Sequence, residues 1–237
     1  MSKPSQPIVV LVHGAWHGAW CFAGLQTELD DRGIASLAVD LPGHGTSLEP
    51  LGDLHGDAAH LASVLATIDA PVVLVGHSYG GAVISQATAA NVTHLVYLTA
   101  FVPDIGETVM TQLQSMPAVR TMLGDAMVIG GNGCSTINPD LARDVFYGQC
   151  HPAHTLANVA RLSAQPFATM TQPLTNAAWR TVPSTYVCCS EDQAIDITHQ
   201  QLMAARCSRV ETLATDHSPF ASMPSETADV LELIWRG

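Results

Sequence analysis

The chain has 237 residues, 47% of them hydrophobic, and its 9 Lys and Arg residues against 21 Asp and Glu residues give a net charge of −12. This length suits a single α/β domain with a sizeable buried core. The acidic balance disfavours nucleic acid and anionic membranes as partners, because a negative protein surface repels both.

The first residues of the chain carry no recognisable targeting signal. Residues 1–7 contain no basic start followed by an apolar stretch, and the apolar run 8–12 is far too short to cross a bilayer. We therefore expect a cytoplasmic protein with no membrane partner. The six cysteines include no C-x-x-C pair and no zinc-like spacing with histidine, so we expect free thiols, no metal and no cofactor.

Short apolar runs that alternate with helical stretches predict a doubly wound α/β sheet. The runs are rich in Val, Ile and Leu without polar alternation, as in parallel strands that are covered on both faces. The predicted strands are residues 8–12, 35–39, 72–75, 94–99, 185–189 and 209–213. The predicted helices are residues 22–32, 57–68, 80–90, 194–206 and 225–235. This alternation indicates a mostly parallel sheet of about six strands.

Residues 103–180 interrupt the alternation, because no strand is recognisable there. We interpret this stretch as a helical cap, or lid, over the carboxyl edge of the sheet, inserted into a core of residues 1–102 and 181–237. The predicted helical pieces of the cap are residues 109–123 and 140–147, with a glycine-rich break at residues 130–133. Five of the eight methionines lie in the cap, either as core filler or as an adaptable apolar pocket wall.

A nucleophile motif follows the third predicted strand. Residues 76–80 read Gly-His-Ser-Tyr-Gly, a G-x-S-x-G sequence between a strand and a helix. So tight a turn needs glycine at its flanks. The turn raises the Ser78 hydroxyl above the sheet at the N-terminus of a helix, and a helix N-terminus stabilises negative charge that develops there. A purely structural turn does not account for a serine at its apex. The motif therefore predicts a nucleophile elbow with Ser78 as the nucleophile.

A serine nucleophile needs a base, and in this strand–turn–helix setting the chain order is serine, acid, histidine. Of eleven histidines, only His199 and His217 follow the cap. His199 falls inside a predicted helix, where we expect a surface residue. His217 lies in the loop after the last predicted strand, at the sheet edge that also carries Ser78. We therefore predict that His217 is the base.

The acid that orients the base is expected in the loop after the strand at residues 185–189. Asp192 is preferred to Glu191, because neighbouring residues that leave a strand face opposite ways. Asp104, which follows the fourth predicted strand, is the alternative acid. Asp216, next to the predicted base, is interpreted as a loop or capping residue.

Two backbone N–H groups are expected to form an oxyanion hole for a tetrahedral intermediate. One belongs to Tyr79, directly after the nucleophile. The other is assigned to Ala15, in the His-Gly loop that follows the first predicted strand. His13 and His17 in the same loop are expected to shape it through hydrogen bonds rather than to bind a metal.

Together these segments resemble the α/β-hydrolase superfamily over nearly the whole chain. Residues 10–20 are similar to the opening of the branch that holds plant methyl esterases and hydroxynitrile lyases, and residues 76–81 resemble its elbow. Residues 191–193 and 216–217 resemble its acid and base segments. The resemblance implies an α/β-hydrolase fold and the same triad and oxyanion residues, namely Ser78, Asp192, His217, Ala15 and Tyr79.

The lyases of that branch resemble one another at two positions at which this chain differs. They carry Thr after the first His of the opening and Lys directly after the catalytic His, where its charge suits a leaving cyanide. This chain has Gly14 and Ser218 at those positions, and its only lysine is Lys3. Both departures favour ester hydrolysis. We therefore predict a serine-dependent carboxylesterase that forms an acyl-enzyme.

Aromatic residues are the expected walls of a substrate pocket. The candidates are Trp16, Phe101 and Trp179, with Trp20 and Phe167 as further ones, and each also fits an ordinary core position. The resemblance implies that the partner is a small, largely apolar ester with a small alcohol leaving group. It also implies a homodimer, because related esterases are often dimeric.

Other functions stay open on the sequence alone. A hydroxynitrile lyase or a hydrolase of carbon–carbon bonds would use the same triad, and a thioesterase, lactonase or amidase is also compatible. Haloalkane dehalogenases and epoxide hydrolases are disfavoured, because they need a carboxylate where Ser78 stands. A small-molecule receptor or binding protein of this fold is the non-enzymatic alternative.

Overall fold

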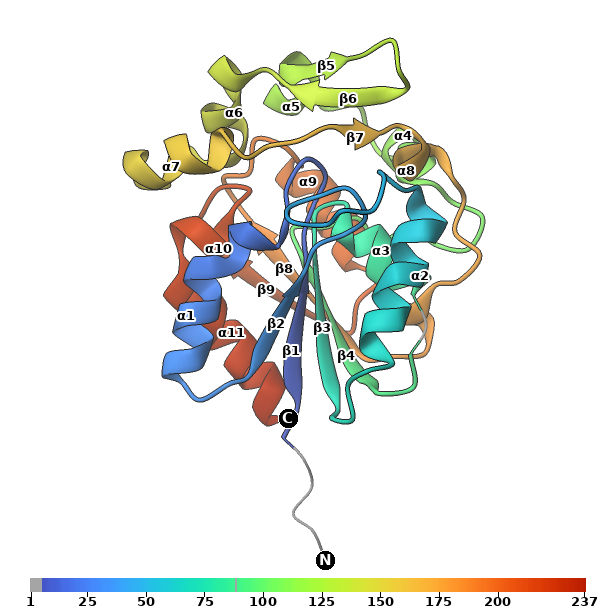
Figure 1. Cartoon of the computed structure of the whole chain (residues 1–237), viewed down its shortest axis with the longest axis vertical. Helices are drawn as coiled ribbons and strands as arrows, with labels where there is room; N and C mark the ends of the chain where they lie inside the picture. The colour runs from blue at the N-terminus through green and yellow to red at the C-terminus, as the bar shows by residue number, and fades with distance from the viewer. Residues whose placement is uncertain (1–5, 88) are drawn as a thin grey trace, which may run out of the picture.

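The computed structural model describes residues 6–87 and 89–237. Its centre is a six-stranded parallel sheet with the strand order β2-β1-β3-β4-β8-β9 (Figure 1). The strands are β1 (Ile8–Val12), β2 (Ser36–Val39), β3 (Val72–His77), β4 (Val92–Leu98), β8 (Ser184–Cys189) and β9 (Arg209–Leu213). The predicted parallel sheet is confirmed, and each predicted strand has a counterpart in it.

Helices cover both faces of this sheet, with α1, α10 and α11 on one face and α2, α3 and α9 on the other (Figure 1). Their bounds are α1 (Ala23–Asp31), α2 (Leu54–Leu65), α3 (Gly80–Gln86), α9 (Ile197–Ala204), α10 (Pro219–Ser222) and α11 (Pro224–Arg236), and the 3-10 helix η1 (Ala19–Phe22) precedes α1. No helix in the described part of the chain is long and apolar enough to cross a membrane.

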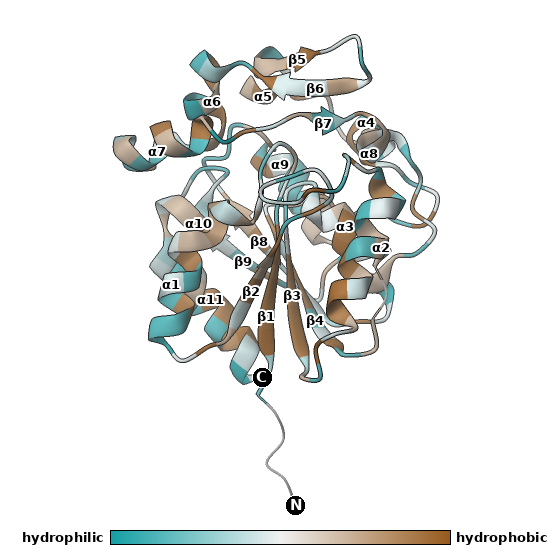
Figure 2. Cartoon of the chain, viewed as in Figure 1, coloured by the Kyte–Doolittle hydropathy of each residue, from teal (hydrophilic) through white to brown (hydrophobic). Residues whose placement is uncertain are grey.

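Alternate residues of the central strands point into two separate hydrophobic cores. Val10 of β1 packs in the core that contains Leu61 of α2. Its neighbour Val9 packs in the core that contains Leu25 of α1 and Leu231 of α11. All five side chains are almost fully buried, and burying a side chain of this size stabilises the fold by about 1.5–3 kcal/mol. Burial on both faces explains why β1 is apolar throughout, while the helices are polar on their outer sides (Figure 2).

Residues 103–180 lie over the carboxyl ends of the strands, but the expectation of a cap without strands is wrong (Figure 1). Three of its strands form an antiparallel sheet in the order β5-β6-β7. Residues 130–133 join β5 to β6 in a hairpin, with Gly133 at a φ of +77°. The sequence signal for this hairpin is the dipeptide Asn132-Gly133, which favours a tight turn between two strands.

The elements of this segment are short. They are α4 (Val109–Ser115), α5 (Met122–Ala126), β5 (Met127–Ile129), β6 (Cys134–Ile137), α6 (Pro139–Phe146), α7 (Pro152–Val159), β7 (Gln165–Pro166), α8 (Ala168–Thr171) and the 3-10 helix η2 (Ala178–Arg180). The helix predicted at residues 109–123 is divided into α4 and α5. Pro117 lies between the two helices, and it disfavours helical geometry for the residue before it and lacks the N–H that a helix needs.

The strand order reverses next to β1, because β2 pairs with one side of it and β3 with the other. In open parallel sheets such a switch point leaves a crevice at the carboxyl ends of the strands, where ligands usually bind. The loop after β1, residues 13–18, and the turn after β3 at Ser78 both begin at this crevice. The topology therefore brings together two segments that are about sixty residues apart in the sequence.

Candidate active site

Ser78 lies at the turn between β3 and α3 with a φ of +52°, a region that residues other than glycine seldom adopt. A Cβ atom at Gly76 would lie 2.6 Å from the carbonyl oxygen of Gly80, and one at Gly80 would lie 2.6 Å from that of Val12. Only glycine fits at both flanks. The packing thus enforces the sharp turn that the motif predicted, and strained backbone of this kind is concentrated at functional sites.

His217 and Asp192 form a buried pair at the same sheet edge. The Nδ1–H of His217 donates to Oδ2 of Asp192 at 2.7 Å, with 2% of the His217 side chain and none of the Asp192 side chain exposed. The backbone N–H groups of Ala194 and Ile195 donate to the other oxygen, Oδ1, at 2.7 and 2.9 Å. These donors fix the orientation of the carboxylate, and the carboxylate fixes the imidazole.

His77 anchors the loop of His217 to the serine turn. Its Nε2–H donates to the carbonyl oxygen of His217 at 2.8 Å, and the centroids of the two rings are 4.6 Å apart. Burial lowers the pKa of His77 well below its usual value, and the nearby His217 lowers it further, so His77 is neutral. In the described part of the chain no hydrogen bond joins Ser78 to His217, and such contacts are often long without substrate.

The alternative acids lie elsewhere. Asp104 is paired with Arg180 near the surface, and hydrogen bonding to that guanidinium lowers the pKa of Asp104. Glu191 accepts a hydrogen bond at the surface from the side chain of Gln149 at 2.7 Å. Asp216 accepts two backbone N–H groups, at 3.0 and 2.8 Å, one of them from Gln149. It therefore caps the loop of His217, as its position in the sequence suggested.

His199 is buried, and the expectation of a surface position is wrong. Its Nε2–H donates to the carbonyl oxygen of Pro117 at 2.7 Å. Residues 103–180 cover this side of α9, and the sequence pattern of the helix alone did not show that cover.

Two unpaired N–H groups, those of Ala15 and Tyr79, belong to buried residues on the loops beside Ser78. Neither donates to an acceptor within residues 6–87 and 89–237. Unpaired N–H groups in buried residues are rare unless they serve a ligand. The next residue, Trp16, has a φ of +64°, so the loop is strained beside one of the two groups.

Hydrogen bonds tie Trp16 to the segment above the sheet. Its backbone N–H donates to Oε1 of Gln165 at 3.2 Å, and its indole Nε1–H donates to Oγ of Ser135 at 3.2 Å. Gln165 and Ser135 are buried, and nothing near them in the sequence marked them as partners of this loop. The conformation of the loop therefore depends on a segment more than a hundred residues away along the chain.

Both histidines of the loop make structural hydrogen bonds. The Nδ1–H of His17 donates to the carbonyl oxygen of Ala15 at 2.8 Å, and its Nε2 accepts from the Tyr147 hydroxyl at 2.8 Å. Burial lowers the pKa of His17 to about 4 and that of His13 to about 3, so both are neutral near pH 7. Among the described residues no group of three His, Cys, Asp or Glu side chains could hold a metal ion.

A cavity of about 110 Å³ opens beside Ser78 and is almost entirely apolar. Its lining residues are Ala15, Trp16, Ser78, Phe101, Val109, Met110, Leu113, Leu123, Met127, Ser135, Phe167 and Met170. Trp16, Phe101 and Phe167 thus line it, as do three of the five methionines expected in the cap.

The other expected wall residues point away from this cavity. The ring of Trp179 lies 5.3 Å and 5.7 Å from the guanidinium carbons of Arg180 and Arg206, and its indole donates to the carbonyl of Pro103 at 3.0 Å. Trp20 faces Arg161 at 4.7 Å. Stacking on arginine cations explains both positions, and the expectation that Trp179 lines the pocket is wrong.

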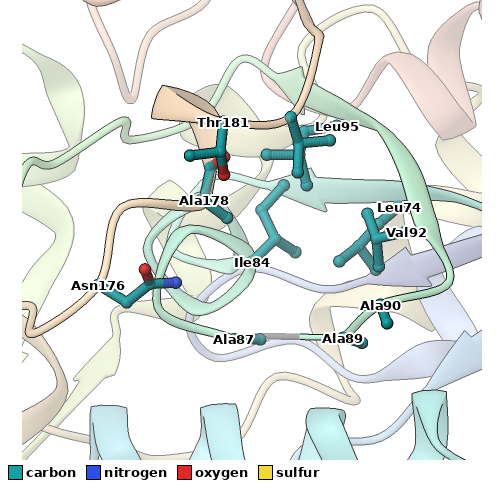
Figure 3. Close-up of a pocket in the computed structure, with 11 residues that line it drawn as sticks. Leu74, Ile84, Ala87, Ala89, Ala90, Val92, Leu95, Asn176, Ala178 and Thr181 are labelled. Atoms are coloured by element: carbon teal, nitrogen blue, oxygen red, sulfur yellow. The ribbon is translucent and has the colours of Figure 1, made fainter.

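A larger hollow of about 370 Å³ lies away from Ser78, beside the carboxyl end of α3 and the start of β4 (Figure 3). Apolar side chains such as Ile84 and Leu95 line it, with Asn176 and Thr181 as the polar groups. The Asn176 amide already donates to the carbonyl of Ser85 at 3.2 Å. Among the described residues that line this hollow, no side chain is titratable or forms a nucleophile–base pair, so the cavity at Ser78 is the candidate active site.

Known proteins resemble this chain over most of its length. A family model described as "Alpha/beta hydrolase family" matches residues 9–230. "Alpha/beta hydrolase nvfD" of Aspergillus novofumigatus is 30% identical over 213 residues, which are 84% of this chain and 83% of that protein. Methylesterase 7 of Arabidopsis thaliana is 29% identical over 260 residues, 98% of this chain and 97% of that one. The crystal structure of a pyrethroid hydrolase from Sphingobium faniae superimposes with a TM-score of 0.85 at 24% identity over 98% of each chain, a likeness of fold.

Proposed function

The chain belongs to the alpha/beta hydrolase family, on the branch of the plant methylesterases, and is a carboxylesterase; on this premise we propose that Ser78, His217 and Asp192 are its catalytic triad. The expected family and fold are confirmed. One observation carries the proposal, namely the buried Asp192–His217 hydrogen bond on a loop that His77 anchors beside Ser78. An activated serine needs a base that is held in one orientation, and this arrangement supplies it.

Each group has one role in the proposed reaction. The Oγ of Ser78 attacks the ester carbonyl while His217 Nε2 accepts its proton, and the unpaired N–H groups of Ala15 and Tyr79 stabilise the oxyanion. His217 then gives the proton to the departing alcohol, which leaves an acyl group on Ser78. Water attacks this acyl-enzyme, His217 takes the proton of the water, and the carboxylic acid departs as Ser78 is protonated again.

The cavity supports a small, largely apolar ester as the substrate. Apart from Ser78 itself, the described residues that line the cavity offer two polar groups, the Ser135 hydroxyl and the Trp16 indole N–H. These two groups are hydrogen-bonded to each other. A charged or strongly polar acyl group would therefore lose its hydration without gaining partners. Flexible methionines in the wall would let the pocket adapt to acyl groups of different shape.

Gly14 supports ester hydrolysis over cleavage of cyanohydrins. The lyases of the branch carry threonine at this position, but here a Cβ atom would lie 2.8 Å from Cβ of Ser78 and 2.9 Å from Nδ1 of His77. The site is thus built around a glycine. The residue after His217 is Ser218, which is fully buried and brings no positive charge to stabilise cyanide.

The direct test is hydrolysis of p-nitrophenyl esters of increasing acyl length by the wild type and by Ser78→Ala. We expect activity with an optimum at a short or medium acyl length and its loss in the alanine variant. A fluorophosphonate probe should label the wild type and not Ser78→Ala, whereas a receptor with an unactivated serine would resist the probe. Full activity of Ser78→Ala would refute the proposal.

The assignment of the acid is tested by a matched pair of substitutions. Asp192→Asn should reduce kcat by roughly 10⁴-fold, as for the acid of other serine triads, because the imidazole then loses its required tautomer. Asp104→Asn removes an ion pair with Arg180 near the surface and should leave kcat nearly unchanged. The opposite ranking would move the acid to Asp104. A cytoplasmic location, a homodimer and the lack of a nucleic acid partner stay predictions.

A further inference from the structure

Thr99 occupies a strained position between the strand of Ser78 and the strand of Asp192. It directly follows β4, which pairs with β3 on one side and with β8 on the other. Its φ is +38°, which is rare for any residue with a side chain and more so for a β-branched one. The described residues other than glycine with positive φ are Trp16, Ser78 and Thr99, so the strain is confined to this site.

The strained turn brings Thr99 and its neighbours into contact with both halves of the site. The hydroxyl of Thr99 donates to Oδ2 of Asp192 at 2.5 Å, a short hydrogen bond to a carboxylate. Two residues further on, the N–H of Phe101 donates to the carbonyl oxygen of Ser78 at 3.1 Å. Thr99 is fully buried, so water does not compete for its hydroxyl.

The oxygen that Thr99 binds is the one that receives the imidazole. Oδ2 of Asp192 accepts from Thr99 and from His217, with a longer contact of 3.4 Å to the amide of Gln200. The backbone amides hold only the other oxygen. Without the Thr99 hydroxyl, the weak Gln200 contact would be the one remaining restraint on Oδ2 besides the imidazole itself.

We propose that Thr99 is a positioning residue of the triad, whose hydroxyl holds Oδ2 of Asp192 where the His217 Nδ1–H must bind. The inference rests on the proposed function of Ser78, His217 and Asp192. The hydroxyl also withdraws part of the negative charge of the carboxylate by hydrogen bonding. The carboxylate therefore attracts a protonated imidazole less strongly than it would without this hydroxyl.

Other titratable groups near the pair do not obscure this effect. Burial lowers the pKa values of His77 and His17, and it raises those of Cys189 and Tyr186, so these four groups keep one neutral form around pH 7. Asp216 is held by two backbone N–H groups and makes no hydrogen bond to Thr99 in the described part of the chain. A shift on the acidic side of the pH profile of kcat/KM would therefore report on the Asp192–His217 pair.

The test compares Thr99→Val, which keeps the shape and branching of the side chain, with Thr99→Ser, which keeps the hydroxyl. For both variants, kcat and KM are measured from pH 5 to 9 beside the wild type and Ser78→Ala. Thr99→Val should lower kcat by about 10- to 100-fold with little change in KM, and it should move the acid limb of kcat/KM to higher pH. Thr99→Ser should restore both. Thr99→Ala replaces the valine variant in the comparison if the latter does not fold.

Proton NMR adds a readout that packing alone would not move. The Nδ1–H of His217 in its hydrogen bond should give a low-field signal, which shifts in Thr99→Val, returns in Thr99→Ser and disappears in Asp192→Asn. An unchanged kcat and acid limb in Thr99→Val, or equal damage in Thr99→Ser, would overturn the inference while the triad stands. If Ser78→Ala keeps its activity, the proposed function fails and the role of Thr99 fails with it.

Discussion

Asp57 should make the stability of the protein depend on pH in an unusual direction. This carboxyl group lies in the first turn of α2 and is 1% exposed. Oδ2 accepts the hydroxyl of Tyr79 at 2.7 Å, whereas the buried Oδ1 has no hydrogen-bond partner in the described part of the chain. Burial raises the pKa of Asp57 to about 6, although the Tyr79 hydroxyl opposes the change.

The sign and size of the effect follow from this pKa. In the unfolded chain the pKa of Asp57 is about 3.9, so between about pH 4 and pH 6 the folded protein holds a proton that the unfolded chain has lost. The protonated group therefore contributes its full stability below about pH 4 and loses that contribution as the pH rises through about 6. A difference of about two pKa units corresponds to roughly 3 kcal/mol of unfolding free energy.

The substitution Asp57→Asn removes this titration and still offers an oxygen to Tyr79. Unfolding free energies from urea denaturation should be measured from pH 4.5 to 8 for the wild type and the variant. Their difference should change by about 2–3 kcal/mol over this range, in favour of the variant at higher pH. The change of this difference with pH is diagnostic. A contact that the new amide fails to make would alter the unfolding free energy by the same amount at every pH.

The exposed Asp30 on α1 provides the control. Asp30→Asn removes the same charge without touching a buried site, so its curve should run parallel to that of the wild type. Parallel curves for Asp57→Asn as well would refute the reasoning, because the buried carboxyl would then titrate as it does in the unfolded chain.

Three further predictions follow from the packing around the site. Gly76→Ala should abolish folding or activity, because its Cβ would lie 2.6 Å from a carbonyl oxygen. Gly24→Ala, whose Cβ would have its nearest neighbour at 3.6 Å, should stabilise α1 by about 0.5–1 kcal/mol. Equal thermal midpoints of unfolding for the two variants would contradict this. Gln165→Met removes the acceptor from the tryptophan of the loop after β1, and kcat should fall about tenfold with little change in KM; a change in KM alone would argue against it. Met170→Ala should move the acyl-length optimum to longer esters, whereas Met122→Ala, which lies outside the cavity lining, should not. Identical optima in the two variants would show that Met170 does not limit the acyl length.

Much of the fold was predictable because its signals are local. The apolar runs predicted the central strands of the sheet, since strands buried on both faces such as β1 and β3 leave a continuous hydrophobic pattern, whereas the edge strand β9 is mostly exposed. The elbow was equally readable, because Gly76 and Gly80 are imposed by contacts that a Cβ would violate. The helical interpretation of residues 103–180 failed where strands of two to four residues were too short to give a period.

The sequence by itself pointed to the proposed triad, through the serine turn and the positions of Asp192 and His217 after late strands, and to an apolar cap. Only the tertiary structure decided the contacts that orient these groups. Thr99 reaches Asp192 from a neighbouring strand, and Gln165 reaches the loop after β1 from the segment above the sheet. Trp179 lies against two arginine guanidinium groups and is not among the residues that line the cavity. The physical reason is that a hydrogen bond or a stacked ring depends on distance and direction between residues far apart in the chain, and no periodicity or spacing encodes these quantities.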